Sequence, residues 1–471
     1  MNRLSLLLAA LAIGATGARA ADDPFPSTYQ PAASQPTLIR NATVLDGTGR
    51  RLDGADVLMR DGKIAAVGAA LAADDATVID AQGRWVTPGL IDVHSHLGVY
   101  ARPAVNAHQD GNEATDPVTA GVWAEHGVWP QDPGFATARG GGVTTLQILP
   151  GSANLIGGRG VTLRNVPSTT MQDMKFPGAP HGLKMACGEN PKRVYGGKGR
   201  APSTRMGNVA GYRQAFADAQ DYRAQWDRYQ LELAAYEAQQ ADGKARRSRS
   251  EPAGKPPVLP KRDLRLETLV AAMDGEIQVH IHCYRADEMA VMLDLAREFG
   301  FKVAAFHHGV EAYKIADRLA AEGVCGALWA DWWGFKMEAY DAIWENLAFV
   351  DAPAKGCAIV HSDSEEGIQR LNQEAAKGMA RGQRAGLDIP PERAIRWITA
   401  NAARSLGIDG LVGTLELGKL ADVVIWNRDP FSVYALADRV YIDGALAYDR
   451  AAPAAQPESD FLLGQQAGGA L

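Results

Sequence analysis

The sequence predicts an α/β protein in which a closed (β/α)8 barrel of the TIM type carries a small β-sandwich domain built from both ends of the chain. Two observations lead to this prediction. Between residues 86 and 409, continuous apolar runs of β-forming residues alternate with helical patterns, as a parallel sheet covered by helices requires. The flanks, residues 37–85 and 410–450, hold short β-type runs broken by Gly and Asp. The central stretch is long enough for eight strand–helix units with insertions.

The composition is that of an ordinary globular protein, with 46% hydrophobic and 22% charged residues in a chain of 471. The formal net charge is −7, and no Lys/Arg block forms the basic stripe that nucleic acid needs. We therefore exclude nucleic acid as a partner and expect a small-molecule substrate. The sequence leaves homo-oligomerisation open.

The first twenty residues have the pattern of a secretory signal peptide. Arg3 supplies a positive charge, "LSLLLAALAIGATG" an apolar core, and "ARA" a cleavage site that ends at Ala20. The apolar run is shorter than the roughly 20 residues that a membrane-spanning helix needs. We expect a mature chain that starts near Ala21, is periplasmic or secreted, and has no membrane attachment after cleavage.

Both flanks of the barrel contribute to the small β domain. Its N-terminal part, residues 37–85, contains "TLIRNATVLDGTG", "ADVLMRDGKIAAVG" and "ATVIDAQGRWVTPG". The same texture returns in residues 410–450 as "GTLELGKLADVVIWNRDP" and "VYIDGALAYD", before a tail at 451–471. We expect the two parts to pair in one domain.

The barrel region, residues 86–409, supplies its strands as apolar runs in chain order. They include "VTPGLIDVHSHLG", "GVTTLQILPG", "HGLKMACGE", "EIQVHIHC", "KVAAFHHG", "GALWAD" and "CAIVHSD". An insertion at about 208–262 is instead rich in Ala, Gln, Glu and Arg, with aromatic residues at helical spacing. We expect a long helix or a helix pair on the surface there; a lid or a dimer contact is the alternative.

Four cysteines, Cys187, Cys283, Cys325 and Cys357, occur in the chain. An oxidising compartment would permit disulfides, but a domain of this size does not depend on them. Because Cys283 lies beside a candidate ligand, we favour free or buried thiols.

Two histidines end the first barrel strand, "VTPGLIDVHSHLG". A strand alternates its faces, so His94 and His96 point the same way. At the carboxyl end of a barrel strand that direction is the mouth where active sites form. Paired imidazoles there indicate a metal site, although an isolated pair is also compatible with two packed core histidines.

Four further strand ends carry chemistry of the same kind. The run "HGLKMACGE" offers Lys184, "EIQVHIHC" offers His280 and His282, "KVAAFHHG" offers His307 and His308, and "CAIVHSD" offers His361 and Asp363. Barrel enzymes place catalytic groups at such positions. Five strand ends of this kind in barrel order favour a metal-dependent active site over chance.

These motifs resemble the amidohydrolase superfamily from about Leu38 to Tyr448. The resemblance rests on "PGLIDVHSHLG", on the histidines that close the fifth and sixth strands, on the Asp that closes the eighth, and on "TANAARSLGI" followed by "GTLELGKLADVVIW". Within the superfamily, "GGVTTLQILPGSANLIGG", "GENPKRVYG", "TRMG" and "RADEM" look like the imidazolonepropionase-like and exported dipeptidase-like branch.

The resemblance implies a set of metal ligands. His94 and His96 match the first-strand pair that binds the more buried metal. A ligand three residues before Arg-Ala-Asp selects His282 over His280, and a ligand before Gly selects His308 over His307. Asp363 matches the eighth-strand carboxylate. The residues left over, His280, His307 and His361, are expected to support the ligands from behind or to pack in the core.

Lys184 matches a lysine that binuclear members of the superfamily carry on the fourth strand. A lysine that faces two cations is driven toward its neutral amine, which CO₂ can carboxylate to a bridging carbamate. The alternative is a surface or substrate-binding lysine, and a mononuclear site would survive without it.

The implied cofactor is a pair of divalent metal ions. Imidazole and carboxylate ligands suit Zn²⁺, with Mn²⁺, Co²⁺ or Fe²⁺ as alternatives. Such a pair lowers the pKa of a shared water toward about 7, so that the water becomes a hydroxide. One of the ions also polarises the scissile carbonyl. Asp363 is the expected catalytic residue, a general base toward the water and then a general acid toward the leaving amine.

Two residues after the fifth strand are the candidates for substrate binding. Relatives carry a second His where this chain has Tyr284, so substrate recognition is expected to differ. Arg285 could bind a substrate carboxylate through its planar fork; a salt bridge to Asp287 or Glu288 is the alternative.

The sequence therefore predicts an exported metal-dependent amidohydrolase that cleaves a carbon–nitrogen bond of a dipeptide or an N-acyl amino acid. A cyclic amide hydrolase or a deaminase would use the same metals. An inactive binding protein on the same fold is the third hypothesis, and the complete ligand set argues against it.

Overall fold

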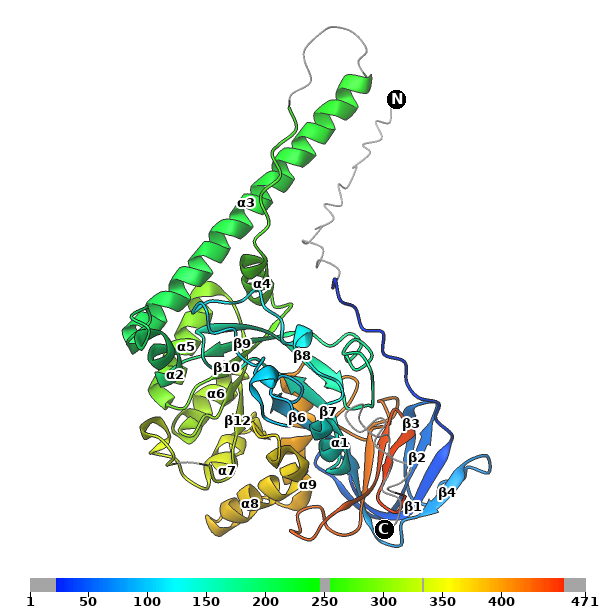
Figure 1. Ribbon diagram of the computed structural model, residues 1–471. Coiled ribbons are helices and arrows are strands. Elements are labelled where there is room, and N and C mark those ends of the chain that lie inside the picture. The colour runs from blue at the N-terminus through cyan, green and yellow to red at the C-terminus, as the bar shows by residue number, and fades with distance from the viewer. Residues whose placement is uncertain (1–22, 246–254, 333, 453–471) are drawn as a thin grey trace, which may run out of the picture.

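The computed structural model describes residues 23–245, 255–332 and 334–452. The expected signal peptide, residues 1–20, and residues 453–471 of the tail lie outside the described residues. Figure 1 shows a barrel and a smaller β domain side by side, with one long helix that extends away from the barrel.

Strands from both ends of the chain form the small β domain, as the sequence predicts. The sheet order is β16-β15-β14-β5-β1-β2-β3, with β4 beside β1. Strand β5 joins the two halves, because it pairs with β1 on one side and with β14 on the other. The strands are β1 (Thr37–Leu45), β2 (Arg51–Arg60), β3 (Lys63–Gly68), β4 (Thr77–Asp80), β5 (Trp85–Pro88), β14 (Val423–Trp426), β15 (Ala437–Ile442) and β16 (Ala445–Asp449).

Eight strands form the barrel sheet in the order of the chain, from β6 to β13. They are β6 (Leu90–Ser95), β7 (Val143–Ile148), β8 (Ile156–Arg164), β9 (Gly182–Ala186), β10 (Gln278–His282), β11 (Val303–His307), β12 (Cys325–Leu328) and β13 (Ala358–Val360). Strand β8 is antiparallel to both β7 and β9, and the other neighbours are parallel. Only residues 149–155 connect β7 to β8, which is too short a connection for a parallel crossover.

A buried carboxylate bridges the two ends of the barrel sheet, β6 and β13. Asp92 on β6 accepts hydrogen bonds from the backbone N–H of Ser362, at 3.1 Å, and from its hydroxyl. The backbone N–H of Asp363 donates to the carbonyl of His94 over 3.0 Å. These contacts bring the eighth-strand carboxylate directly beside the first-strand histidines.

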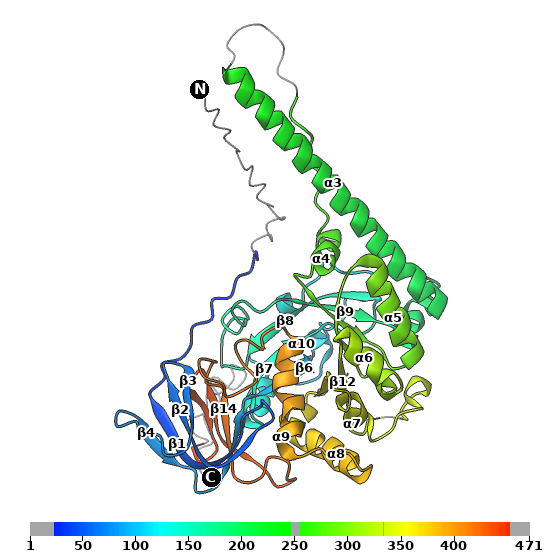
Figure 2. The same ribbon diagram turned by 180° about the vertical axis from the view of Figure 1, so that it is seen from behind.

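Helices surround the barrel, and Figure 2 shows α5 and α6 on its outer side. The α-helices are α1 (Pro133–Gly140), α2 (Glu189–Gly196), α3 (Arg205–Ala245), α4 (Leu264–Met273), α5 (Ala286–Phe299), α6 (Ala316–Glu322), α7 (Asn346–Asp351), α8 (Leu371–Arg384), α9 (Pro391–Ala394) and α10 (Ala400–Ser405). Short 3₁₀ turns are η1 (Asn106–His108), η2 (Ala124–His126), η3 (Ala312–Ile315), η4 (Met337–Ala339), η5 (Gly367–Arg370) and η6 (Ile395–Ile398).

The helical insertion contains one 41-residue helix, α3. Its first half packs on the barrel, where Tyr212, Phe216 and Tyr222 are buried and Phe216 stacks on Phe301 with ring centroids 4.6 Å apart. Beyond Tyr222 the side chains up to Ala241 are half-buried or exposed, and both views show the helix leaving the body. Even this helix is too polar to cross a bilayer, and no other helix among the described residues meets the requirement.

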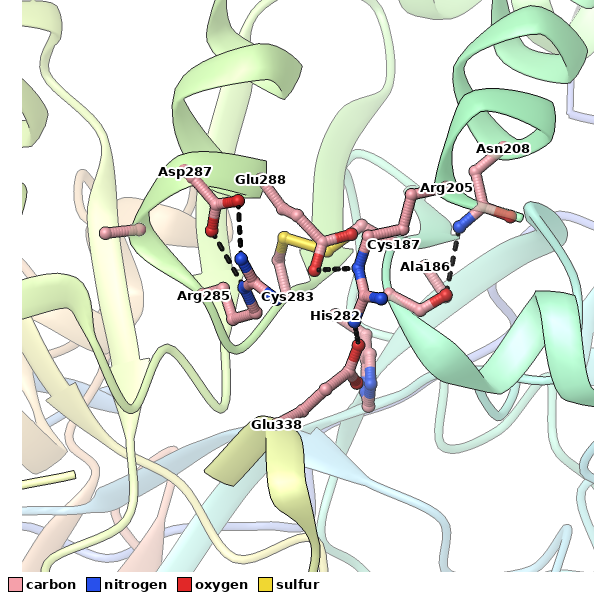
Figure 3. The surroundings of a disulfide bond; sticks show 12 residues. Ala186, Cys187, Arg205, Asn208, His282, Cys283, Arg285, Asp287, Glu288 and Glu338 are labelled. Atoms are coloured by element: carbon pink, nitrogen blue, oxygen red, sulfur yellow. Dashed lines mark hydrogen bonds and ion pairs between the residues drawn. A yellow bond between two sulfur atoms is a disulfide. The ribbon is translucent and has the colours of Figure 1, made fainter. Parts of the chain in front are cut away.

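The expectation of free thiols is wrong, because all four cysteines form disulfides. Cys187 and Cys283 directly follow the paired strands β9 and β10, so their Cα atoms lie 5.2 Å apart (Figure 3). Cys325 and Cys357 join β12 to the residue before β13 in the same way. Parallel pairing of neighbouring strands brings the thiols together. The sequence does not show this, because the paired cysteines are far apart along the chain.

A buried ion cluster ties the barrel to the small β domain. Arg164 at the end of β8 donates two hydrogen bonds of 2.6 Å to Asp422 and lies 2.9 Å from Asp443. The Tyr29 hydroxyl donates to the other oxygen of Asp443. We call these four residues the junction cluster.

Candidate metal centre

A cavity of about 460 Å³ opens at the carboxyl ends of the barrel strands. It is the place where barrel folds hold their functional groups. Its lining combines metal-ligand side chains with a polar and aromatic wall: His94, His96, Tyr100, Asn112, Gly151, Ser152, Lys184, Glu189, Asn190, Arg193, His282, Tyr284, His308, Phe335, Lys336 and Asp363.

The first-strand histidines and the eighth-strand carboxylate converge in this cavity. The Nε2 atoms of His96 and His94 lie 3.1 and 3.5 Å from Oδ1 of Asp363, and Nε2 of His308 lies 3.8 Å from its Oδ2. His94, His96 and Asp363 form one group whose ligand atoms are close enough to hold a metal ion. His94 lies in β6, His96 directly follows that strand, and Asp363 follows β13; hydrogen bonds between the two strand ends bring the three residues together.

The tautomer of His96 follows from its hydrogen bond. Nδ1 of His96 lies 2.8 Å from the carbonyl oxygen of Leu149, which can only accept. Nδ1 therefore carries a proton in either protonation state of the ring. Nε2 has a lone pair in the neutral ring and can donate to Asp363 in the protonated ring. Such an outer hydrogen bond is the usual support of a metal-binding imidazole.

His308 and Asp363 adopt backbone conformations that are rare for residues with a side chain. Their φ angles are +63° and +48°, in the left-handed region. Strained conformations of this kind persist where the surrounding structure holds them, and they concentrate at functional sites. Here each turns a side chain that could bind a metal ion into the cavity after its strand ends.

Lys184 reaches the same centre from β9. Its Nζ lies 3.3 Å from Nε2 of His94, and its side chain is almost fully buried. Burial lowers the pKa of Lys184 from 10.5 to about 8, because a charged ammonium is poorly solvated there. Part of the Lys184 population therefore has a neutral amine near neutral pH.

The pKa of Asp363 is lowered, whereas burial alone would raise the pKa of an acid. Burial raises its pKa, but the hydrogen bond and charge of His96 outweigh that effect and hold the pKa below its usual value. The carboxylate is therefore ionised at neutral pH. It can accept a proton, which is the property that a general base needs.

His282 lies at the end of β10, beside His308, with ring centroids 4.8 Å apart. Its Nε2 is 3.4 Å from Nδ2 of Asn190, a residue of α2. The ring of Tyr284 packs edge-on against His282 at 4.8 Å. The structure thus brings His282 and Tyr284 into the cavity wall, where the sequence places a ligand and a substrate contact.

The three remaining histidines lie directly behind the cavity. Nδ1 of His307 lies 2.8 Å from Nδ1 of His94, and Nε2 of His307 lies 2.9 Å from Nδ1 of His280. The ring of His361 packs 4.7 Å from that of His308, and neither of its nitrogens has a hydrogen-bond partner. None of the three belongs to the cavity lining, but His361 lies close enough to His94 and His308 for the three to share a metal ion.

Arg285 is not brought into the cavity. Its guanidinium donates two hydrogen bonds of 2.9 Å to Asp287, and 41% of its side chain is exposed. Figure 3 shows the pair turned toward each other, away from His282. The salt bridge that the sequence left as an alternative is the one that forms, because Arg285 and Asp287 flank the start of α5 and meet locally.

Other cationic and polar residues, which sequence reasoning did not assign, line the cavity instead. Lys336, from the loop after β12, lies 3.3 Å from Oδ1 of Asn190 and 4.2 Å from the ring centre of Tyr284. Arg193 joins them from α2. Asn190 and Arg193 stand in "GENPKRVYG", which sequence reasoning used only to place the chain in a branch, whereas Lys336 carried no signal.

The donor set fits a divalent metal. Nδ1 of His308 and both ring nitrogens of His361 are buried without a hydrogen-bond partner, which is rare and costly unless something absent from the protein chain completes them. His94, His308 and His361 form a second group able to hold an ion. Imidazole nitrogens with a carboxylate match the ligands that zinc and similar ions take in proteins.

A barrel with this donor set at its mouth is the architecture of a metal-binding α/β protein. Residues 355–450 match the model of the Amidohydrolase family. An amidohydrolase from Thermotoga maritima MSB8, known from its crystal structure, is 33% identical with a TM-score of 0.76, over 88% of this chain and 100% of that chain. The chain therefore belongs to the amidohydrolase family, whose members are hydrolases acting on carbon–nitrogen bonds.

Two further relatives differ in how far they extend. Amidohydrolase tasK of Hapsidospora irregularis is 31% identical over 463 residues, which is 89% of this chain but 44% of that protein. The chain thus spans less than half of that relative. A crystal structure of a Xaa-Pro dipeptidase with bound methionine in the active site is 16% identical, with a TM-score of 0.51 over 88% of this chain and 100% of that chain, and shows the fold alone.

Proposed function

We propose that this protein is a metal-dependent hydrolase that cleaves the carbon–nitrogen bond of a dipeptide or an N-acyl amino acid. The observation that carries the proposal is the meeting of ligand-type side chains and cations in one cavity. His94, His96 and Asp363 form its inner end, and Lys336 and Arg193 lie in its wall. A substrate with a scissile amide and a free carboxylate matches both.

The residues that would hold two metal ions are His94, His96, His282, His308 and Asp363, with carboxylated Lys184 as the bridge. Zinc is the expected ion. When bound, the ions lower the pKa of water toward about 7 and polarise a carbonyl. The neutral Nζ of Lys184 would form an N–C bond to CO₂ and release a proton to solvent, which would give an anionic carbamate able to bind metal.

Asp363 would move the proton in this reaction. Its ionised carboxylate takes the proton of the attacking water and returns it to the nitrogen of the leaving amine. His96, 3.1 Å away, holds Oδ1 of that carboxylate in place. The backbone bond from Asp363 to the carbonyl of His94 fixes the strained turn that aims it.

The carboxylate of the substrate would meet Lys336 and Arg193, which take the role that the sequence suggested for Arg285. Lys336 has two neighbours on α2, Oδ1 of Asn190 at 3.3 Å and Oε1 of Glu189 at 3.5 Å. Burial and the nearby Arg193 lower the pKa of Lys336, although Glu189 opposes them. An incoming carboxylate would stabilise both cations.

The test is a screen of zinc-loaded protein against dipeptides and N-acyl amino acids, each paired with its C-terminal amide. We expect hydrolysis of one or more acids and at least about a tenfold lower kcat/KM for the matching amides, since a charged hydrogen bond contributes about 1.5–3 kcal/mol. Turnover of cyclic amides or release of ammonia from amino-substituted rings would instead identify the alternative activities. A protein that binds no transition metal would overturn the proposal in favour of a binding protein.

The bridge is tested separately by substituting Lys184→Ala. The parent protein should hold two ions per chain, and the variant should lose metal and activity, with partial recovery in a small carboxylic acid that fills the gap. Metal analysis decides the matter: one ion per chain, unaffected by the substitution, would show a mononuclear site.

We also propose that the chain is exported to the periplasm or the medium. The sequence of residues 1–20 supports this, as do the two disulfides that use every cysteine, because disulfides persist in oxidising compartments. N-terminal sequencing of the functional protein should begin near Ala21. Finding Met1 intact would contradict export.

A further inference from the structure

A line of buried side chains leads from His94 down into the barrel. Nδ1 of His94 meets Nδ1 of His307 at 2.8 Å, Nε2 of His307 meets Nδ1 of His280 at 2.9 Å, and Nε2 of His280 lies 3.4 Å from Nε2 of Gln147. At most 1% of any of these four residues is exposed. We call this line the imidazole chain.

The hydrogen bonds of the imidazole chain can all be donated in one of two directions, either away from His94 or toward it. A neutral imidazole has one N–H donor and one lone pair, so each ring that donates on one side must accept on the other. If His94 donates to His307, then His307 donates to His280, and His280 presents an N–H to Gln147. If Gln147 donates at its end, every bond reverses and the proton of His94 moves to Nε2.

The metal centre is compatible with only one of these directions. Nε2 of His94 is the nitrogen that faces Lys184 and Asp363, at 3.3 and 3.5 Å. It can bind a cation only through its lone pair, which requires the proton of His94 to lie on Nδ1. The chain must then run away from the metal, and Gln147 must accept from His280.

Gln147 has an acceptor available for this purpose. Its amide nitrogen faces His280, while Oε1 is buried without a hydrogen-bond partner. A half-turn of the amide would point Oε1 at Nε2 of His280 and give both atoms a partner. The two ends of the amide have nearly the same size, so the turn needs no repacking.

The packing around the amide leaves little other freedom. A Cβ atom on Gly182 would lie 2.7 Å from Nε2 of Gln147 and 3.2 Å from Cδ2 of His280. The absence of a side chain at Gly182 therefore makes the room in which this contact forms.

We infer that Gln147, through His280 and His307, is a positioning residue that sets the tautomer of His94 and so the affinity of the centre for metal. This inference rests on the proposed metal centre, since it concerns how the chain prepares His94 as a ligand. Hydrogen bonds to the outer nitrogen of a metal-binding histidine commonly change metal affinity by 10–100-fold. Gln147 would act on the hydrogen bond of His94 through the two intervening histidines, His280 and His307.

The experiment compares Gln147→Met, which removes the acceptor, with Gln147→Glu, which keeps one. Zinc affinity is measured by competition with a chromophoric chelator, without substrate. We expect Gln147→Met to weaken zinc binding about tenfold and Gln147→Glu to stay near the parent. Thr162→Val is the matched control, because Thr162 pairs with Gln147 across β7 and β8 and its buried hydroxyl has no partner.

A second readout follows the protons themselves. In zinc-loaded protein labelled with ¹⁵N at histidine, the parent should show His94 protonated at Nδ1, and His307 and His280 protonated at Nε2. In Gln147→Met the signals of His280 and His307 should shift, whereas Thr162→Val should leave them unchanged. Thermal unfolding in chelator separates these effects from a simple loss of stability.

The outcomes separate this inference from the proposed function. Parent-like zinc affinity and histidine signals in Gln147→Met, with zinc bound in both proteins, would overturn the role of the imidazole chain and leave the hydrolase proposal standing. Absence of zinc binding by the parent would overturn the metal centre and the inference with it.

Discussion

Two buried clusters of polar side chains differ in how completely they satisfy their own atoms. In the junction cluster, all four carboxylate oxygens of Asp422 and Asp443 have a partner in Arg164, Tyr29 or the backbone. At the metal centre, Nδ1 of His308 and both nitrogens of His361 have none. Both clusters are buried to a similar degree.

The difference indicates what each cluster does. Native proteins pair nearly all of their buried polar atoms, and among the side chains of the junction cluster Nε of Arg164 alone lacks a partner. The cluster is therefore a structural element that fastens β8 to the small domain. At the candidate metal centre three imidazole nitrogens lack a partner, which indicates a site for a ligand. Substitutions in the first cluster should therefore change stability, and substitutions in the second should change chemistry.

The largest expected effect is on catalysis, from Asp363→Asn. Asparagine keeps the shape and one oxygen ligand but cannot accept a proton, and general acid–base catalysis contributes about 10²–10⁴-fold. We expect kcat to fall at least about a hundredfold while metal content and thermal stability stay close to the parent. His94→Asn, by contrast, should lose the metal as well. A near-parental kcat in Asp363→Asn with metal in place would move the role of base elsewhere, with His361 and His307 tested next.

The next effect is on folding, from Arg164→Met. This change leaves Asp422 and Asp443 buried without their cation, which typically costs about 3–5 kcal/mol. Urea unfolding should show that loss in the free energy of unfolding. Arg297→Met is the control: Arg297 is 66% exposed and pairs with Asp294 on the surface, where ion pairs contribute about 0–1 kcal/mol. Equal losses in the two variants would contradict the structural role of the cluster.

Lys184→Met should stabilise the metal-free protein. Because burial lowers the pKa of Lys184 from 10.5 to about 8, the unfolded chain binds a proton that the folded chain releases between these values. Folding is therefore penalised below pH 8, by up to about 3 kcal/mol, and the penalty fades as pH rises toward 10.5. Chelator-treated, CO₂-free samples should show the variant more stable at pH 7, with a gap that narrows at pH 10. A gap that widened with pH would show the opposite sign.

The smallest effect is expected from Tyr29→Phe. The hydroxyl of Tyr29 donates to the buried carboxylate of Asp443, and a hydrogen bond to a charged group contributes about 2 kcal/mol. Denaturant unfolding should detect the loss, with kcat unchanged. Tyr340→Phe, at a residue that is 73% exposed, should leave the free energy of unfolding where it was.

The sequence by itself determined the architecture and the inner end of the cavity. Strand periodicity placed His94 and His96 on one face, and the order of apolar runs placed Lys184, His282, His308 and Asp363 at strand ends that a barrel must bring together. Placement at strand ends needed only local conformation and the rule that parallel strands share an edge, whereas the resemblance to the amidohydrolase superfamily selected His282 over His280 and His308 over His307. The reversed direction of β8 could not be predicted in this way. It depends on the short connection between β7 and β8, and the sequence does not show where β7 ends and β8 begins.

Tertiary structure alone decided which side chains meet across elements. It paired Cys187 with Cys283 through strand neighbourhood, turned Arg285 to Asp287, and placed Lys336 in the cavity wall from a loop without a motif. It also stacked His307, His280 and Gln147 behind His94, although three different strands supply them. Such contacts are set by register and by the packing of strands that are distant in the chain, and local pattern holds no information about either.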